Sequence, residues 1–245
     1  MQLNRTINEQ SNHFIQSSLP HEENLNNGGF FITFEGSEGC GKSTQIARLA
    51  EFFQKGNVTS PSREVLLLRE PGGTGVGEQI RSILQYAPES AAMAPETELL
   101  LFAASRAQLV REIIRPALSR GAIVLCDRFL DSTTVYQGVA RALNQEEVTW
   151  MNQFATGGTL PNITILLDLE VAIGRKRMVS RNANSSTMPD RIEQESEVFF
   201  EAIRHGYLTL AEQEPDRIIV IDASGSADEV TEKILSKLKA LTHIL

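Results

Sequence analysis

The stretch Gly36-Ser37-Glu38-Gly39-Cys40-Gly41-Lys42-Ser43 decides the fold of this chain. It matches the pattern G-x-x-x-x-G-K-[ST] in full, which is typical of a phosphate-binding loop. The glycines let the backbone curl until successive N–H groups face one anion, and the following helix adds the positive end of its dipole. We therefore expect residues 36–44, up to Thr44, to bind the phosphates of ATP, with Lys42 on the β- and γ-phosphates and Ser43 on Mg²⁺.

The sequence around this loop alternates between short apolar runs and helix-length segments. The apolar runs are Phe30–Phe34, Val65–Leu68, Ile123–Cys126, Ile163–Leu169 and Ile218–Ile221. The segments of helix length are Lys42–Gln54, Val76–Gln85, Glu96–Arg120, Ser132–Thr156, Val171–Arg181, Glu193–Gln213 and Asp228–Leu241. Continuous apolar runs indicate strands buried on both faces. The alternation predicts an α/β fold in which helices flank a doubly wound, five-stranded parallel sheet.

Composition limits which binding partners and which cellular compartment are expected for this protein. The 245 residues carry 23 Lys and Arg against 31 Asp and Glu, a formal net charge of −8. This balance disfavours binding to nucleic acid or to a membrane surface. No apolar run approaches the roughly 18 residues that a membrane helix needs. Two distant cysteines, Cys40 and Cys126, predict a reduced protein of the cytoplasm.

The first 29 residues differ from the rest of the chain. They are polar and rich in asparagine, without the apolar core of a signal peptide or the arginines of a transit peptide. We expect a disordered tail over 1–29 and one domain over 30–245.

Polar clusters follow three of the predicted strands. Arg69-Glu70-Pro71-Gly72-Gly73-Thr74 follows the second strand, Asp127-Arg128 the third and Asp222-Ala223-Ser224-Gly225 the fifth. Because the carboxyl ends of parallel strands meet at one edge of the sheet, ligands bind there. The three clusters therefore predict a single site on that edge.

Asp127 and Arg128 indicate the kind of chemistry. A carboxylate that closes an apolar strand holds Mg²⁺ in many nucleotide-binding proteins, although it can instead cap the next helix. Arg128 is better suited to gripping a second phosphate than to activating water. A switch GTPase is disfavoured, because the sequence contains no Asn-Lys-x-Asp stretch to read guanine.

Six ordered motifs together resemble the thymidylate kinase family over about residues 30–241. They are Phe34-Glu35-Gly36 with the phosphate loop, Arg69 to Thr74, Leu101-Phe102-Ala103-Ala104-Ser105-Arg106, Asp127-Arg128, Ser132-Thr133-x-x-Tyr136-Gln137-Gly138 and Asp190-Arg191-Ile192-Glu193. The resemblance implies the phosphorylation of dTMP to dTDP by ATP with Mg²⁺. It also implies the strand order 2-3-1-4-5, with the adenine near Ala223 and Ser224, and a homodimer.

The resemblance also assigns acceptor-binding residues. Phe102 and Arg106 are four apart and so share a helix face, where the matching family pair meets thymine. Arg69 and Arg128 match positions on the dTMP phosphate, and two guanidinium groups suit a dianion. Without the resemblance, Phe102 could be a core residue and Arg106 part of a surface ion pair.

Five further side chains are implied on the acceptor side. Ser132 and Thr133 match positions beside the base, and Tyr136 and Gln137 match positions near the sugar and the base. Glu38 matches a residue that accepts a hydrogen bond from the 3′-hydroxyl, which would explain a carboxylate inside a phosphate loop. Each could otherwise be an ordinary helix-start or loop residue.

Gly39 stands where one subgroup of the family carries a catalytic arginine, so positive charge must come from elsewhere. The segment 174–191 supplies five cations against the single acid Asp190, namely Arg175, Lys176, Arg177, Arg181 and Arg191. We expect this segment to be a lid. Arg181 and Arg191 are its preferred catalytic residues, beside Lys42 and Asp127.

Two other functions stay open at this point. Another nucleoside monophosphate kinase or a deoxynucleoside kinase of the same fold is one, although a deoxynucleoside kinase would have little use for Arg69 and Arg128 together. A nucleotide-binding module without catalysis is the other, and the intact Lys42, Ser43 and Asp127 disfavour it.

Overall fold

The computed structural model describes residues 28–55, 63–87, 90, 92–183 and 191–240. The tail predicted over 1–29 lies outside the described residues except for its last two positions. The middle of the predicted lid, 184–190, also lies outside them. The described helices include none that is long and apolar enough to cross a membrane.

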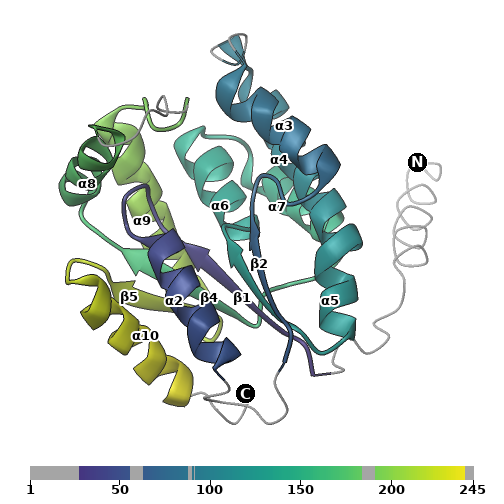
Figure 1. Cartoon of the computed structure of the whole chain (residues 1–245). Helices are drawn as coiled ribbons and strands as arrows, with labels where there is room; N and C mark the ends of the chain where they lie inside the picture. Colours follow the sequence, from purple (N-terminus) through teal and green to yellow (C-terminus); the bar gives the residue numbers. More distant parts are fainter. Residues whose placement is uncertain (1–27, 56–62, 88–89, 91, 184–190, 241–245) are drawn as a thin grey trace, which may run out of the picture.

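Five parallel strands in the described residues form one sheet in the order β2-β3-β1-β4-β5, which confirms the predicted fold and strand order (Figure 1). The strands are β1 (Phe30–Glu35), β2 (Val65–Arg69), β3 (Ile123–Asp127), β4 (Ile163–Asp168) and β5 (Ile218–Asp222). β1 pairs with β3 on one side and with β4 on the other. The strand that leads into the phosphate loop is therefore at the centre of the sheet.

Helices cover both faces of the sheet (Figure 1). They are α2 (Lys42–Gln54), α3 (Gly75–Tyr86), α4 (Pro95–Leu109), η2 (Val110–Ile114), α5 (Arg115–Ser119), α6 (Leu130–Thr133), η3 (Thr134–Ala140), α7 (Gln145–Thr156), α8 (Val171–Ala183), α9 (Glu197–Gln213) and α10 (Ala227–Ala240), where η marks a π-helical turn. Side chains of β1 alternate between the two faces. Ile32 and Phe34 pack with α2 and α10, whereas Phe31 packs with η2 and α5.

The expectation that every strand is buried on both faces is correct for three of them. β1, β3 and β4 are buried along nearly their whole length. It is wrong for the edge strands β2 and β5, where Leu67 is 52% exposed and Val220 is 41% exposed. A continuous apolar run therefore marked a strand correctly but did not distinguish the centre of the sheet from its edges.

The single helix predicted over 132–156 is also wrong. The helical turns end at Ala140, and α7 begins only after Asn144. The Asn144 side chain accepts hydrogen bonds from the N–H groups of Glu146 at 2.8 Å and Glu147 at 3.3 Å. This helix cap satisfies N–H groups that the start of a helix leaves unpaired. The sequence contained the signal, an asparagine followed three residues later by glutamate.

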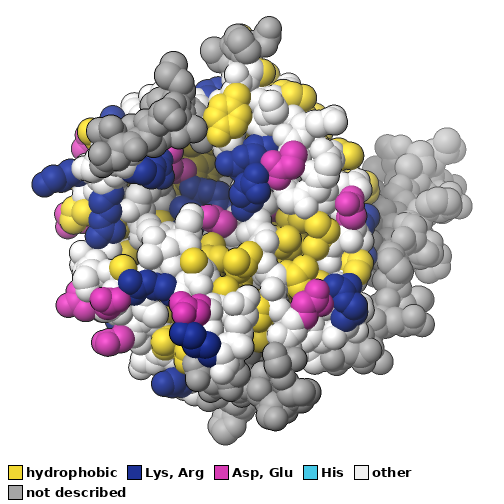
Figure 2. All heavy atoms as spheres, viewed as in Figure 1, with side chains coloured by type: hydrophobic (Ala, Val, Ile, Leu, Met, Phe, Trp, Pro, Cys, Tyr) yellow, Lys and Arg dark blue, Asp and Glu magenta, His cyan; other side chains and the backbone are white. Residues whose placement is uncertain are grey.

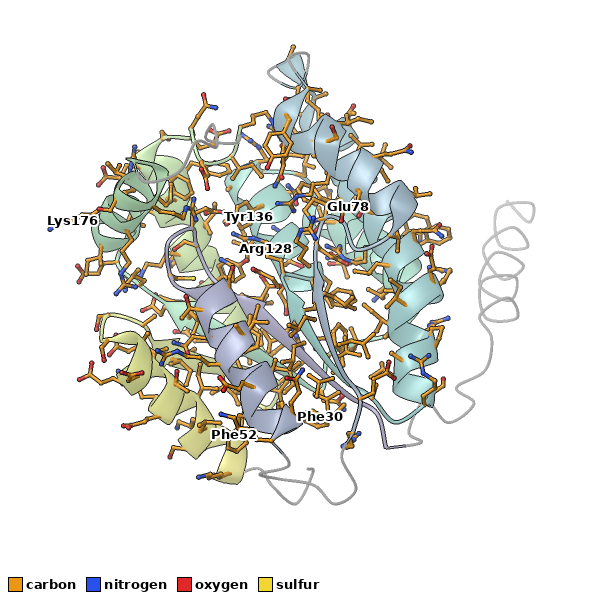
Figure 3. The ribbon with its side chains drawn as sticks, in the orientation of Figure 1. Phe30, Phe52, Glu78, Arg128, Tyr136 and Lys176 are labelled. Carbon is orange, nitrogen blue, oxygen red and sulfur yellow. The ribbon has the colours of Figure 1, made fainter. Side chains whose placement is uncertain are left out.

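The strand register aligns the predicted polar clusters. Asp127 at the end of β3 lies opposite Arg69 of β2 and opposite Phe34 of β1. Figure 3 shows Arg128 and Tyr136 close together at this carboxyl edge, with Phe30 at the opposite end of the sheet. The predicted clusters after β2 and β3 therefore lie at one edge, beside the phosphate loop that follows β1, and the parallel pairing of β4 with β5 directs the cluster after Asp222 to the same edge.

Candidate active site

A cavity of about 670 Å³ opens at the carboxyl edge of the sheet, and Figure 2 shows Lys and Arg side chains gathered around this hollow. Most sequence-predicted site residues line it, namely Glu38, Gly39, Cys40, Gly41, Lys42, Ser43, Thr44, Arg69, Phe102, Asp127, Arg128, Ser132, Thr133, Tyr136, Gln137 and Arg181. Four predicted residues are not part of its wall, namely Gly36, Ser37, Arg106 and Arg191.

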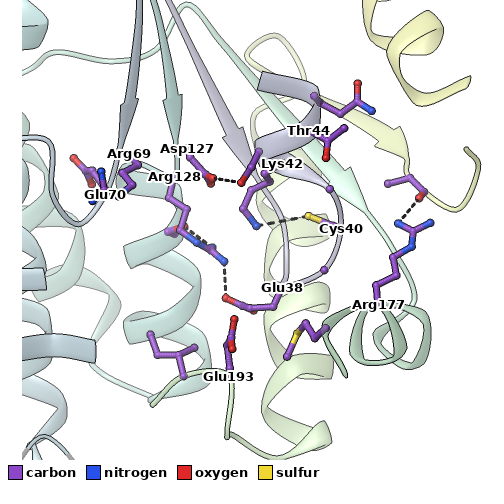
Figure 4. Close-up of a pocket in the computed structure, with 18 of the residues that line it drawn as sticks. Glu38, Cys40, Lys42, Thr44, Arg69, Glu70, Asp127, Arg128, Arg177 and Glu193 are labelled. Carbon is purple, nitrogen blue, oxygen red and sulfur yellow. Dashed lines mark hydrogen bonds and ion pairs between the residues drawn. The ribbon is translucent and has the colours of Figure 1, made fainter. Parts of the chain in front are cut away.

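The phosphate loop presents the start of α2 to the cavity. Gly41 precedes α2 in the left-handed region, at φ +100°, and its helix start has no side-chain cap. The Lys42 ammonium group donates to the backbone carbonyls of Gly36 and Ser37, both at 3.0 Å, and lies 3.6 Å from the Cys40 sulfur (Figure 4). Uncapped N–H groups and a lysine that spans the loop form an anion-binding concavity.

Gly39 packs directly against the backbone of α8. Its φ is +76°, and a Cβ atom there would lie 2.3 Å from the carbonyl oxygen of Gly174. A Cβ atom on Gly174 would in turn lie 2.7 Å from the carbonyl oxygen of Glu38. The close approach therefore requires glycine on both sides. It gives a physical reason why the arginine of one family subgroup is missing at position 39.

Ser43 and Asp127 provide neighbouring oxygen atoms. The Ser43 hydroxyl donates to Oδ2 of Asp127 at 3.2 Å. Oδ1 of Asp127 is buried and has no hydrogen-bond partner among the described residues. Buried polar atoms are normally satisfied, and oxygen donors of this kind are those that Mg²⁺ prefers. The residues present therefore fit a Mg²⁺ ion.

Two arginines line the opposite side of the cavity, each beside a carboxylate. Arg69 lies 2.8 Å from Oε2 of Glu78, and Arg128 lies 2.5 Å from Oε1 of Glu38 (Figure 4). The Arg128 guanidinium also lies 4.9 Å from the ring centre of Tyr136. Burial alone would lower the pKa of Arg128, but Tyr136 and Glu38 hold it well above its ordinary value. Arg128 is therefore a permanent, partly buried cation.

Glu38 turns toward the second set of residues and not toward the loop amides. Both of its carboxylate oxygens accept from the Tyr136 hydroxyl at 2.9 Å, in addition to the Arg128 contact. A carboxylate held by a cation and a phenol is displaced from the part of the loop that would face an anion. This arrangement removes the apparent conflict of an acid inside a phosphate loop.

Arg106 lies behind the cavity wall, whereas Phe102, with which it was predicted to share the base site, lines the cavity. It is 1% exposed and forms an ion pair of 2.7 Å with Glu70. It also donates to the Phe129 carbonyl at 3.1 Å and to the Thr133 hydroxyl at 3.0 Å. Burial raises the pKa of Glu70, so this acid needs a buried cation beside it. Spacing of four residues predicted a shared face but not what that face would meet.

The two lid arginines that the sequence favoured as catalytic lie in different places. Arg181 lines the cavity and pairs with Glu193, whereas Arg191 is paired with Glu98 outside it. Arg177 also lines the cavity, and it donates to the Ala223 carbonyl at 3.2 Å. The sequence included Arg177 in the basic cluster but did not prefer it. Its position one helical turn before Arg181 was the available signal.

Three buried residues that support the site were not predicted, namely Glu35, Tyr207 and Glu98. Glu35 accepts from the Ser132 hydroxyl at 2.6 Å and from the Tyr207 hydroxyl at 2.7 Å. Glu98 accepts from the Gln137 amide at 2.6 Å. Burial, and then Asp131, raise the pKa of Glu35 to about 7. Burial would also raise the pKa of Glu98, but hydrogen bonds from Gln137 and Arg191 lower it overall.

A phosphate loop, a strand-end carboxylate and a second group of cations across one cavity define a P-loop kinase. A family model described as thymidylate kinase matches residues 34–234. The thymidylate kinase of Desulfosudis oleivorans is 49% identical over 216 residues, covering 87% of this chain and 98% of that protein. The thymidylate kinase of Kosmotoga olearia is 46% identical over 217 residues, covering 87% and 99%.

A solved structure agrees with these relatives. The crystal structure of thymidylate kinase from Ehrlichia chaffeensis matches with a TM-score of 0.68 and 30% sequence identity, covering 86% of this chain and 99% of that one. The chain belongs to the thymidylate kinase family. Membership confirms the activity that the motifs predicted, the phosphorylation of dTMP to dTDP with ATP as co-substrate.

The contact between Gly39 and Gly174 can be tested by adding one methyl group. We expect Gly39→Ala and Gly174→Ala each to lower the free energy of unfolding by about 2 kcal/mol, because a backbone carbonyl occupies the space. Urea denaturation measures the change. Gly75→Ala is the matched control, since nothing lies within 4 Å of a Cβ atom there. Equal stability of all three variants would contradict the close approach.

Proposed function

We propose that ATP binds along the phosphate loop 36–44 and that dTMP binds on the opposite side of the same cavity. One observation carries this assignment. The loop and the arginine pair Arg69 and Arg128 line a single cavity, so two phosphate groups can meet there. The gap between these two grips is where phosphoryl transfer takes place.

On the ATP side, Lys42 contacts the β- and γ-phosphates, and the amide groups at the start of α2 support them. Ser43 and Asp127 hold Mg²⁺, which when bound neutralises phosphate charge. The unpaired Oδ1 of Asp127 supports this role. The adenine lies near Ala223, which lines the same cavity, and near its neighbour Ser224.

On the dTMP side, Arg69 and Arg128 bind the phosphate and the Phe102 ring packs against thymine. Glu38 and Tyr136 contact the sugar. Ser132, Thr133 and Gln137 surround the base. Arg106 supports this wall from behind, through its bonds to Glu70 and Thr133. The Phe102 ring and the two arginines support an acceptor that has a planar base at one end and a doubly charged phosphate at the other.

Catalysis consists of positioning and charge neutralisation. The acceptor phosphate is already ionised, so no side chain has to remove a proton from it. Lys42 and Arg181 are the protein cations placed to stabilise the transferring group. Arg191 is paired with Glu98 outside the cavity, which makes Arg181 the stronger candidate of the two.

We also propose a cytoplasmic homodimer that binds neither nucleic acid nor membranes. Two free, buried cysteines, Cys40 and Cys126, suit a reducing compartment. On α7, Trp150 and Phe154 are 55% and 62% exposed, and their rings stack with centres 5.5 Å apart. Exposed aromatic groups of this kind favour a protein interface.

The acceptor is tested by measuring ADP release with dTMP, dUMP, UMP, CMP, AMP and thymidine at equal concentration. We expect the highest kcat/KM with dTMP and little turnover of thymidine, because Arg69 and Arg128 require a phosphate group. Turnover of thymidine that equals turnover of dTMP would contradict the proposal, and preference for another monophosphate would reassign the acceptor.

Two substitutions test the ATP side and the dTMP side of the cavity separately. Lys42→Ala should lower kcat by about a hundred- to a thousandfold, because it removes a cation from the transferring phosphate. Arg128→Ala should raise KM for dTMP and lower kcat, while KM for ATP stays unchanged. Lys176→Ala is the control, because Lys176 points away from the cavity (Figure 3). An unchanged KM for dTMP would remove Arg128 from the acceptor site.

The dimer is tested by placing a charge on the aromatic pair. We expect Phe154→Glu to convert the dimer into a monomer in sedimentation or light-scattering measurements, because a buried unpaired charge is costly. Val198→Glu is the control, since Val198 of α9 is 79% exposed and lies outside the aromatic pair. A dimer that survives Phe154→Glu would place the interface elsewhere.

A further inference from the structure

Arg128 has an unusual backbone conformation for its residue type. Its φ is +68°, in the left-handed region that side-chain-bearing residues seldom adopt. Such a conformation persists when its surroundings fix it. Here the Arg128 N–H donates to the Phe34 carbonyl at 3.0 Å, and the following N–H, of Phe129, donates to Oε1 of Glu35 at 2.7 Å. The end of β1 therefore holds the turn that carries Arg128.

The Arg128 side chain is linked to the Glu35 carboxylate through two hydroxyl groups. Ser132 and Tyr207 donate to Oε2 of Glu35 at 2.6 and 2.7 Å. Their oxygen atoms in turn accept from the Arg128 guanidinium at 3.1 and 3.4 Å. A hydroxyl has one proton, so a proton directed to Glu35 leaves the oxygen lone pairs directed to Arg128.

We propose that Glu35 and Tyr207 are positioning residues for the acceptor phosphate, which act by fixing both the backbone and the guanidinium of Arg128. This inference rests on the proposed role of Arg128. Neither residue lines the cavity, so neither contacts a substrate there. Both also bond Ser132, which lines the cavity, and the inference assigns their effect to Arg128. Tyr207 comes from α9, 79 residues after Arg128. The packing of α9 on the sheet therefore determines where the Arg128 guanidinium lies.

Protonation of Glu35 is expected to weaken this arrangement. An ionised carboxylate only accepts hydrogen bonds, whereas the protonated group donates one and turns a hydroxyl proton away from it. Burial and Asp131 raise the pKa of Glu35 to about 7, so the ionised form dominates above that pH. The charged and titratable groups near Glu35 are Asp131 with its partner Arg217, Arg128, Tyr207 and Cys126.

The test is a double-mutant cycle in the full-length enzyme. We expect Tyr207→Phe, which removes only the hydroxyl, to raise KM for dTMP about three- to tenfold, the effect of losing one ordinary hydrogen bond. KM for ATP should stay unchanged. In an Arg128→Ala background the same substitution should change KM for dTMP less than twofold, because Tyr207 would have nothing left to position.

Thr33→Val is the matched control. Thr33 lies two residues before Glu35 on β1, and its buried hydroxyl bonds the Thr164 hydroxyl at 2.8 Å. The substitution removes a buried hydrogen bond near Glu35 at a residue that does not contact Arg128. KM for dTMP and KM for ATP should therefore both stay unchanged. A rise in KM for dTMP in Thr33→Val as large as in Tyr207→Phe would overturn the inference.

Glu35→Gln provides a second readout, because the amide keeps the volume and does not titrate. The ratio of wild-type to Glu35→Gln kcat/KM for dTMP should rise between pH 6 and 8. The phosphate of dTMP titrates near pH 6, but it does so equally for both enzymes and cancels in the ratio. A flat ratio would overturn the role of Glu35.

The outcomes also separate this inference from the proposed function. An additive effect of Tyr207→Phe in the Arg128→Ala background would overturn the inference alone, because Tyr207 would then act without Arg128. An Arg128→Ala enzyme with unchanged KM for dTMP would overturn the acceptor assignment and the inference together.

Discussion

The parallel register of the three strands β2, β3 and β1 is the constraint on which the site depends. Pairing places Arg69 opposite Asp127 and Asp127 opposite Phe34, so the chain leaves all three strands at one level. A shift of any strand by one residue would turn its side chains to the other face of the sheet. Asp127 would then leave Ser43 and Arg128 would leave Glu38. The core that buries β1 on both sides therefore also sets how far the phosphate loop lies from Arg69 and Arg128.

A second constraint is electrostatic. The cavity gathers several cations in a protein of net charge −8, and three of them have a carboxylate beside them. Glu78 lies with Arg69, Glu38 with Arg128 and Glu193 with Arg181. These acids reduce the mutual repulsion of the cations and keep their side chains ordered. A bound phosphate can then compete for groups that are already in place, so less ordering entropy is lost on binding.

The sequence was sufficient for the fold and for most of the cavity wall, because both follow from local patterns. The phosphate loop, the five strands and the residues at their ends are each readable within a few positions. The burial of Arg106 was not predicted, because its helix spacing does not reveal the buried Glu70 that it pairs with. Glu35 was missed for a similar reason, since Tyr207, which bonds it, lies 172 residues away. Contacts between such distant positions arise only from the packing of complete elements.

The contact between Gly39 and Gly174 links the missing loop arginine to the position of α8. The backbone of α8 approaches the phosphate loop so closely that no side chain fits at position 39. The same approach brings Arg177 and Arg181, one and two turns further along α8, into the cavity wall. A side chain at position 39 and the close approach of α8 therefore exclude one another. In this chain the helix occupies that space, and its Arg177 and Arg181 line the cavity.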